Sequence, residues 1–286
     1  MNGGARLALF AAASVALFAG AAGAGRAIDL DAGQSNAHGA GDGHASVGGH
    51  AAAAAAEDAS AAGIAGDGLR LVTTNREVES GRESPFAFRI VDDRGVALED
   101  FDITHARRMH LLVVRRDLTG YQHLHPTRAP DGTWTVPLRL DEAGVYRVFA
   151  DFSSGGDRIT LGTDVVVPGS FQPHELPAPA TTARSGGYEV RLDDESGGGG
   201  RVEFTVLRGG APVGDLEPYL GALGHLVTLR DGDLAFLHVH PAGDATSAGR
   251  IAFDVEYPSQ GRYRLFLQFK HAGRVQTVEF TQEVGP

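Results

Sequence analysis

Two related stretches decide the fold, DEAGVYRV at residues 141–148 and its counterpart GRYRL at residues 261–265. In both, a glycine comes before a run in which Tyr146 or Tyr263 alternates with arginine and aliphatic residues. Alternation of this kind directly after a turn is typical of a β-strand that buries one of its faces. Both stretches therefore predict a strand that begins after a glycine turn.

Other runs of the same kind surround the first stretch. They are rich in Val, Ile, Leu, Phe and Tyr, turn residues separate them, and they cover 70–73, 86–91, 109–115, 121–125, 134–140, 146–152 and 159–167. About seven strands in about 100 residues predict a β-sandwich.

The strand-forming part of the chain is an internal duplication. GVALEDF at 95–101 corresponds to GAPVGDL at 210–216, and HLHP at 123–126 corresponds to HVHP at 238–241, both at the same offset. A repeat of about 100 residues is the size of a complete domain rather than of a solenoid unit. The expected fold class is all-β, with two tandem immunoglobulin-like (Greek-key) sandwiches at 69–167 and 188–286. A proline-rich linker is expected at 168–187.

The first 68 residues differ sharply in composition from the rest, since they hold 25 alanines and 14 glycines. Arg6 followed by the apolar run 7–22 and small residues predicts a signal peptide over 1–28. The alternative is an uncleaved membrane anchor, but the run is short for a spanning helix and consists mostly of alanine. Residues 29–68 have no aromatic, lysine or arginine side chain, which predicts a disordered tether.

Composition excludes several classes of function. The chain of 286 residues has no cysteine, which rules out disulfides, thiolate metal sites and iron–sulfur clusters. A net charge of −11 argues against a nucleic-acid partner, which needs a basic surface. We expect an exported protein that is periplasmic, extracellular or at the cell surface, with membrane contact only if the signal stays uncleaved.

Each copy carries one histidine, a second thirteen residues later, and a third in the motif His-x-His-Pro. These residues are His110, His123 and His125 in the first copy and His225, His238 and His240 in the second. In a strand, residues i and i+2 share a face. A hairpin that sets His110 opposite His125, and His225 opposite His240, would bring three imidazoles of each copy to one point.

Three imidazoles without a thiolate suit Cu(II), Zn(II) or Ni(II). Asp102, Glu217 and His105 are weaker candidates for a further ligand. The alternative is a structural network, because His110 shares its strand face with Leu112 and Val114, which suggests that the face looks into the sandwich. The cost of burying titratable rings without a ligand favours the metal site.

The pattern of the histidines, the following Asp-Gly and the Gly-x-Tyr resembles uncharacterised bacterial exported proteins with duplicated domains of this kind. The 141–148 stretch also resembles the Asp-x-x-Gly-x-Tyr-x-Cys of immunoglobulin strand F, which implies a corner hydrogen bond from the tyrosine. More loosely, the chain is similar to periplasmic copper-handling proteins of the CopC and YtkA-like kind. It has no methionine-rich segment, which proteins of the CopC kind often carry.

The expected function is binding of Cu(II) or Zn(II), to buffer or deliver the metal outside the cytoplasm, with one three-histidine site per domain. An envelope metal transporter or another membrane protein is a possible partner, and His38, His44 and His50 of the tether could assist capture. The alternatives are a non-catalytic envelope interaction module with structural histidines and, least favoured, a metal-dependent enzyme.

Overall fold

The computed structural model describes residues 65–66, 68–194, 200–237, 239–242 and 248–285. The predicted signal peptide, nearly all of the predicted tether, and His238 lie outside these residues. Among the described residues no helix is long and apolar enough to span a bilayer.

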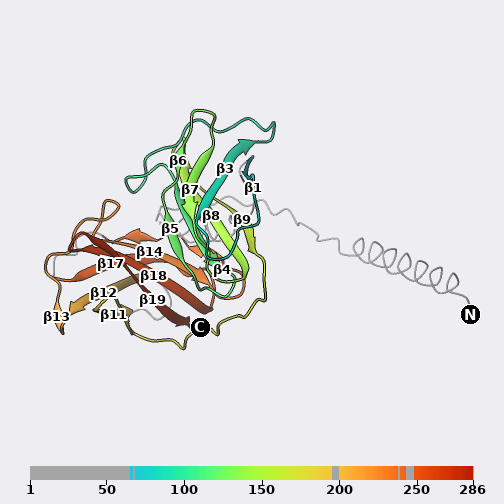
Figure 1. Ribbon diagram of the computed structural model, residues 1–286. Coiled ribbons are helices and arrows are strands. Elements are labelled where there is room, and N and C mark those ends of the chain that lie inside the picture. Colours follow the sequence, from blue (N-terminus) through green and yellow to red (C-terminus); the bar gives the residue numbers. More distant parts are fainter. Residues whose placement is uncertain (1–64, 67, 195–199, 238, 243–247, 286) are drawn as a thin grey trace, which may run out of the picture. The chain divides into compact units, whose positions relative to one another are not determined.

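The first repeat is a sandwich of two antiparallel sheets (Figure 1). One sheet has the order β1-β2-β3-β7-β6 and the other β5-β4-β8-β9. Their bounds are Ala65–Gly66 (β1), Leu69–Thr73 (β2), Ser84–Asp92 (β3), His110–Arg115 (β4), Gln122–Leu124 (β5), Thr127–Arg128 (β6), Trp134–Leu138 (β7), Gly144–Ser154 (β8) and Asp157–Val167 (β9). All seven runs predicted from the sequence form strands.

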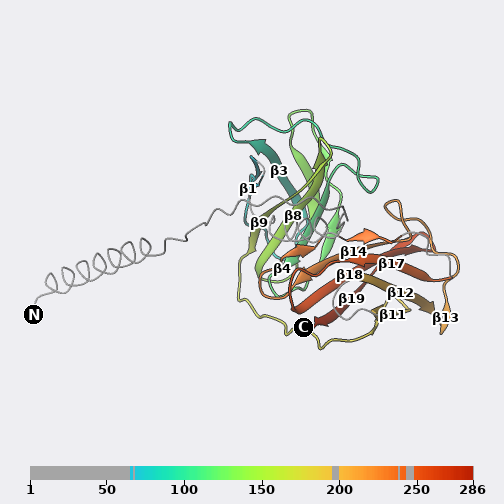
Figure 2. The same ribbon diagram turned by 180° about the vertical axis from the view of Figure 1, so that it is seen from behind.

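The second repeat is built in the same way (Figure 2). One sheet has the order β10-β11-β12-β17-β16, with β13 paired to β12, and the other β15-β14-β18-β19. The bounds are Thr182–Ser185 (β10), Tyr188–Asp194 (β11), Gly200–Arg208 (β12), Ala211–Pro212 (β13), Gly224–Arg230 (β14), Phe236–Leu237 (β15), His240–Pro241 (β16), Arg250–Val255 (β17), Gly261–His271 (β18) and Arg274–Val284 (β19). Strand β10 falls within the stretch expected to be linker.

The tyrosine corner is present in both repeats. Tyr146 Oη donates to the carbonyl of Glu142 at 2.9 Å, and Tyr263 Oη donates to the carbonyl of Ser259 at 2.8 Å. Val148, at the position where an antibody domain has its cysteine, is fully buried in an apolar core. The prediction of undisulfided sandwiches with a tyrosine corner is confirmed.

Each sandwich has its own core, and a third apolar cluster joins the two repeats. Its buried members are Leu112, Val114, Leu118, Phe149, Val227, Leu229, Leu234, Phe236 and Phe266. Tyr121 of the first repeat also stacks on Phe266 of the second, with ring centroids 4.1 Å apart. All six residues of β4 are buried, because one face of this strand packs into its own sandwich and the other packs against the second repeat.

This arrangement corrects one expectation. The face of β4 that carries His110, Leu112 and Val114 was expected to look into the sandwich, but Leu112 and Val114 belong to the cluster between the repeats. The alternate residues Leu111 and Val113 point into the core of the first repeat. The histidine that begins β4 therefore lies on the side facing the second repeat.

The linker after β9 is held against the first repeat by polar and aromatic contacts. The guanidinium of Arg115, 1% exposed, forms an ion pair with Glu142 and donates to the carbonyl of Gln172. It also lies over the ring of Phe171, 4.8 Å from the centroid. Arg115 is therefore a buried anchor for the linker.

Candidate metal centre

The hairpin β4–β5 brings three histidines of the first repeat together. Leu112 pairs with His123 and Leu111 with Leu124, which is the register that sets His125 opposite His110. One ring nitrogen of each histidine lies within 4.8 Å of those of the other two, and this is the group of described residues suited to hold a metal ion. His110 is 3% exposed, while His123 and His125 are half-buried.

Two outer hydrogen bonds fix the protonation of two rings. His110 Nε2 lies 3.1 Å from the carbonyl oxygen of Thr104, which can only accept, so this nitrogen carries the proton. His123 Nδ1 lies 2.7 Å from Oε1 of Gln268, whose amide nitrogen donates to Thr277 Oγ1. With the amide in this orientation, His123 Nδ1 is the donor.

In the neutral state, the inward nitrogen of each of these two rings then carries a lone pair and can only accept a hydrogen bond. His110 Nδ1 and His123 Nε2 face one another at 3.0 Å. With the Gln268 amide turned the other way, His123 Nε2 would donate to His110 Nδ1; with the amide as it stands, a metal ion would satisfy both nitrogens. A third inward atom, Nε2 of His125, is buried without a hydrogen-bond partner. One ring nitrogen from each of the three histidines converges at one place, and a divalent metal ion would bind all three.

A proton is the other species that could separate His110 from His123. Burial and the neighbouring His110 lower the pKa of His123 to about 3 and that of His125 to about 4, so both rings are neutral at pH 7. A proton on His110 would place a cation on a side chain that is 3% exposed, beside other imidazoles. Burial of an unpaired charge is expensive, so a protonated ring is disfavoured, whereas bonds from several ring nitrogens offset the burial of a metal ion.

The spacing suits a small ion. A tetrahedral ion with metal–nitrogen bonds of about 2.0–2.1 Å holds its nitrogens about 3.3 Å apart. The distance of 3.0 Å between His110 Nδ1 and His123 Nε2 and the upper limit of 4.8 Å within the group bracket that value. Small rotations of the rings would therefore complete the coordination.

The second repeat contributes to the same place. The ring of His225, at the start of β14, stacks on His123 with centroids 4.7 Å apart and lies 5.8 Å from His110. Gln268, which fixes the proton of His123, lies on β18 directly opposite His225. The ring of His105, a weaker candidate, lies at the edge of the cluster, 6.1 Å from His110 and 5.7 Å from His225.

His240, a predicted ligand of the second repeat, does not belong to the three-histidine group. His240 is exposed on β16, pairs in the sheet with Asp254, and accepts a hydrogen bond from Arg158 of the first repeat at 3.3 Å. Since His238 is outside the described residues, the predicted second site is not described as a whole. The pairing of Thr228 with Leu237 does show the predicted hairpin register.

Asp102 and Glu217 have a shared structural role. Asp102 accepts a hydrogen bond from the backbone of Gly156 at 2.9 Å, in the turn between β8 and β9. Glu217 accepts one from Gly273 at 2.6 Å, in the corresponding turn of the second repeat, and pairs with Lys270. Neither belongs to the three-histidine group, because each is engaged at a hairpin turn.

Two features were not predicted from the sequence. Gln268 was missed because a glutamine in a strand has no recognisable pattern until its partner across the repeats is known. The second is His271, which is 8% exposed and links Tyr188 Oη at 2.6 Å to Asp215 Oδ1 at 3.0 Å. This chain of hydrogen bonds lies in the second repeat and is not part of the histidine cluster.

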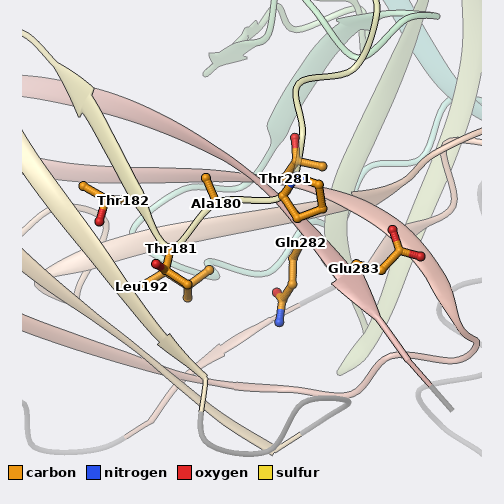
Figure 3. A pocket seen from close by; sticks show the side chains of 8 residues that line it. Ala180, Thr181, Thr182, Leu192, Thr281, Gln282 and Glu283 are labelled. Atoms are coloured by element: carbon orange, nitrogen blue, oxygen red, sulfur yellow. The ribbon is translucent and has the colours of Figure 1, made fainter.

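The pocket in Figure 3 is lined by other types of residue than the histidine cluster. Residues 179–182, Leu192 and residues 281–283 line it, and its labelled side chains come from β10, β11, β19 and the linker. Glu283 is its one titratable lining residue. A single carboxylate among threonines is too few ligands for a metal site of the kind that the three histidines form.

Comparison with solved structures finds similar multidomain proteins at low identity. The α2-macroglobulin of Salmonella matches with a TM-score of 0.29 and 16% identity over 79% of this chain and 15% of that one. The adhesin FdeC of Escherichia coli matches with a TM-score of 0.26 and 13% identity, over 78% of this chain and 65% of that one. InvD of Yersinia pseudotuberculosis matches with a TM-score of 0.25 and 13% identity, over 74% of this chain and 56% of that one. The chain spans less than two thirds of the length of each of these proteins.

A family comparison is more informative about what the chain is. No curated protein matches it, so the likeness to copper-handling proteins stays an expectation. One family model, however, matches twice, at residues 64–169 and 181–285, which are the two sandwiches. The chain therefore belongs to the family described as Domain of unknown function (DUF8832) and carries two copies of its domain.

Proposed function

We propose that the chain is an exported protein that binds a divalent transition metal through His110, His123 and His125. The observation that carries the proposal is the convergence of one ring nitrogen from each of the three histidines, all within 4.8 Å of one another. Imidazole ligands suit Cu(II) and Zn(II), whereas the absence of cysteine argues against a site for Cu(I).

The role we propose is buffering or delivery of the metal outside the cytoplasm, with an envelope metal transporter or another membrane protein as the exchange partner. The apolar, alanine-rich run 7–22 supports export. Binding is favoured over catalysis because Asp102 and Glu217, the recurrent carboxylates that could serve as a general base, are bound to turn amides.

The test is metal analysis of the full chain purified without an affinity tag, followed by titration with Zn(II) and Cu(II) in a calorimeter. The tether histidines His38, His44 and His50 are replaced by alanine in every sample, because they could bind metal independently. We expect a saturable binding event that disappears in the double variant His123→Ala/His125→Ala. The same event in that variant would refute the proposal.

A matched control is His174→Ala. His174 is half exposed in the linker and contacts Glu142 rather than the cluster. Its replacement removes one imidazole from the chain without touching the site, so binding should be unchanged.

A further inference from the structure

One imidazole of the cluster comes from the other repeat. His225 stacks on His123 at 4.7 Å and an interplanar angle of 29°, and lies parallel to His110 at 5.8 Å and 12°. It begins a strand whose following residues Val227 and Leu229 are buried in the apolar cluster between the repeats. The position of His225 is therefore set by the same packing that joins the two sandwiches.

The three rings of the group are spaced like imidazoles around one ion, and the ring of His225 lies beside them. With a metal–nitrogen bond of about 2.0–2.1 Å, a ring centroid lies about 3.2 Å from the ion, and tetrahedral centroids are about 5.2 Å apart. Within the three-histidine group the centroid distances are 5.2, 5.2 and 4.8 Å. The ring of His225 lies at similar distances from His123 and His110, 4.7 and 5.8 Å. Its nitrogens are not among the atoms that lie within 4.8 Å of one another, so the ring has to turn toward the ion to bind it.

We propose that His225 is the fourth ligand, so that a single ion is held by both repeats and its coordination is closed by protein. This inference rests on the proposed function, since it concerns the same site. Gln268 supports it from the same sheet, because its hydrogen bond to His123 spans the two repeats at the site itself.

A closed site has a chemical consequence. Three histidines alone leave a fourth position for water or another small ligand, as in catalytic zinc sites, whereas four protein ligands leave none. The ion then cross-links the two sandwiches, and its release requires His225 to withdraw from it. Closed coordination of this kind fits holding and handing over a metal rather than activating a water molecule.

The test uses Co(II) as a visible probe in the full chain with His38, His44 and His50 replaced by alanine. Azide is added to the Co(II)-loaded parent and to the variant His225→Phe, which keeps a stacking ring but has no nitrogen. We expect no change in the Co(II) absorption bands of the parent and an azide-dependent shift in His225→Phe. The variant His240→Phe is the control and should behave as the parent.

An azide-dependent shift in the parent itself would overturn the inference, because it would reveal an open position whether or not His225→Phe folds. So would identical spectra of parent and His225→Phe without azide. These outcomes leave the three-histidine proposal intact. If the parent binds no Co(II), Zn(II) or Cu(II), the proposed function fails and this inference fails with it.

Discussion

The hydrogen bond between His123 and Gln268 offers a prediction whose size can be worked out from the structure. In Gln268→Leu the volume of the side chain is nearly kept, but Nδ1 of His123 loses the acceptor at 2.7 Å. Removal of a hydrogen-bond partner outside a metal site costs about 10–100-fold in affinity. That is about 1.4–2.7 kcal/mol, within the range of about 1–3 kcal/mol for leaving a buried donor unsatisfied.

Calorimetric titration with Zn(II) measures this effect directly, and two further variants sharpen it. Gln268→Glu keeps an acceptor and adds charge, which should strengthen the bond to His123 and tighten binding. Asp151 already provides a carboxylate at the corresponding position of the first repeat, where it accepts a hydrogen bond from Thr160. Gln276→Leu, on the neighbouring strand β19, is the control and should leave the affinity unchanged.

The reasoning would be refuted if Gln268→Leu bound Zn(II) as tightly as the parent. The unfolding of each variant is measured in the presence of chelator, so that a general loss of stability is separated from a loss of affinity. A Gln268→Leu protein that is folded and binds normally would show that this bond does not set the tautomer of His123.

Three other predictions concern stability, each measured by denaturant unfolding of the metal-free chain. Because the pKa of His123 falls from 6.5 in the unfolded chain to about 3 in the fold, the unfolded state alone takes up the proton below pH 6.5. The contribution of His123 to the free energy of unfolding is thus fully present above pH 6.5 and is lost as the pH falls toward 3. At pH 5 the loss from this residue is about 2 kcal/mol. A free energy of unfolding that does not fall between pH 6.5 and pH 5 would contradict this prediction. Phe266→Ala, at the contact with Tyr121, should cost about 3–5 kcal/mol, and a loss below 1 kcal/mol would argue against the packing between the repeats. Tyr146→Phe should cost about 1 kcal/mol through the corner hydrogen bond, and an unchanged midpoint would mean that the bond contributes nothing.

Much of each sandwich could be predicted because its determinants are local. Alternating apolar residues, glycine turns and the tyrosine of the corner each depend on a few neighbouring residues, and the structure has the strands where these signals place them. The pairing of Leu112 with His123 was also predictable, since hairpin register follows from the position of the turn.

The environment of the histidines could not be predicted in the same way. The unbroken apolar run at 111–114 indicates a strand buried on both faces, but it does not say what covers the second face. That face is covered by Val227 and Leu229 of the other repeat, more than 100 residues away in the chain. The contributions of His225 and Gln268 depend on this packing, so sequence reasoning assigned His225 to a separate site and missed Gln268.

X-ray absorption at the zinc edge tests the central claim most directly. The sample is the Zn(II)-loaded full chain in which His38, His44 and His50 are replaced by alanine. The account predicts at least three imidazole nitrogens at about 2.0–2.1 Å from the ion, reduced in number in His123→Ala/His125→Ala. A shell made of oxygens with one imidazole or none, or a spectrum that the double variant leaves unchanged, would contradict it.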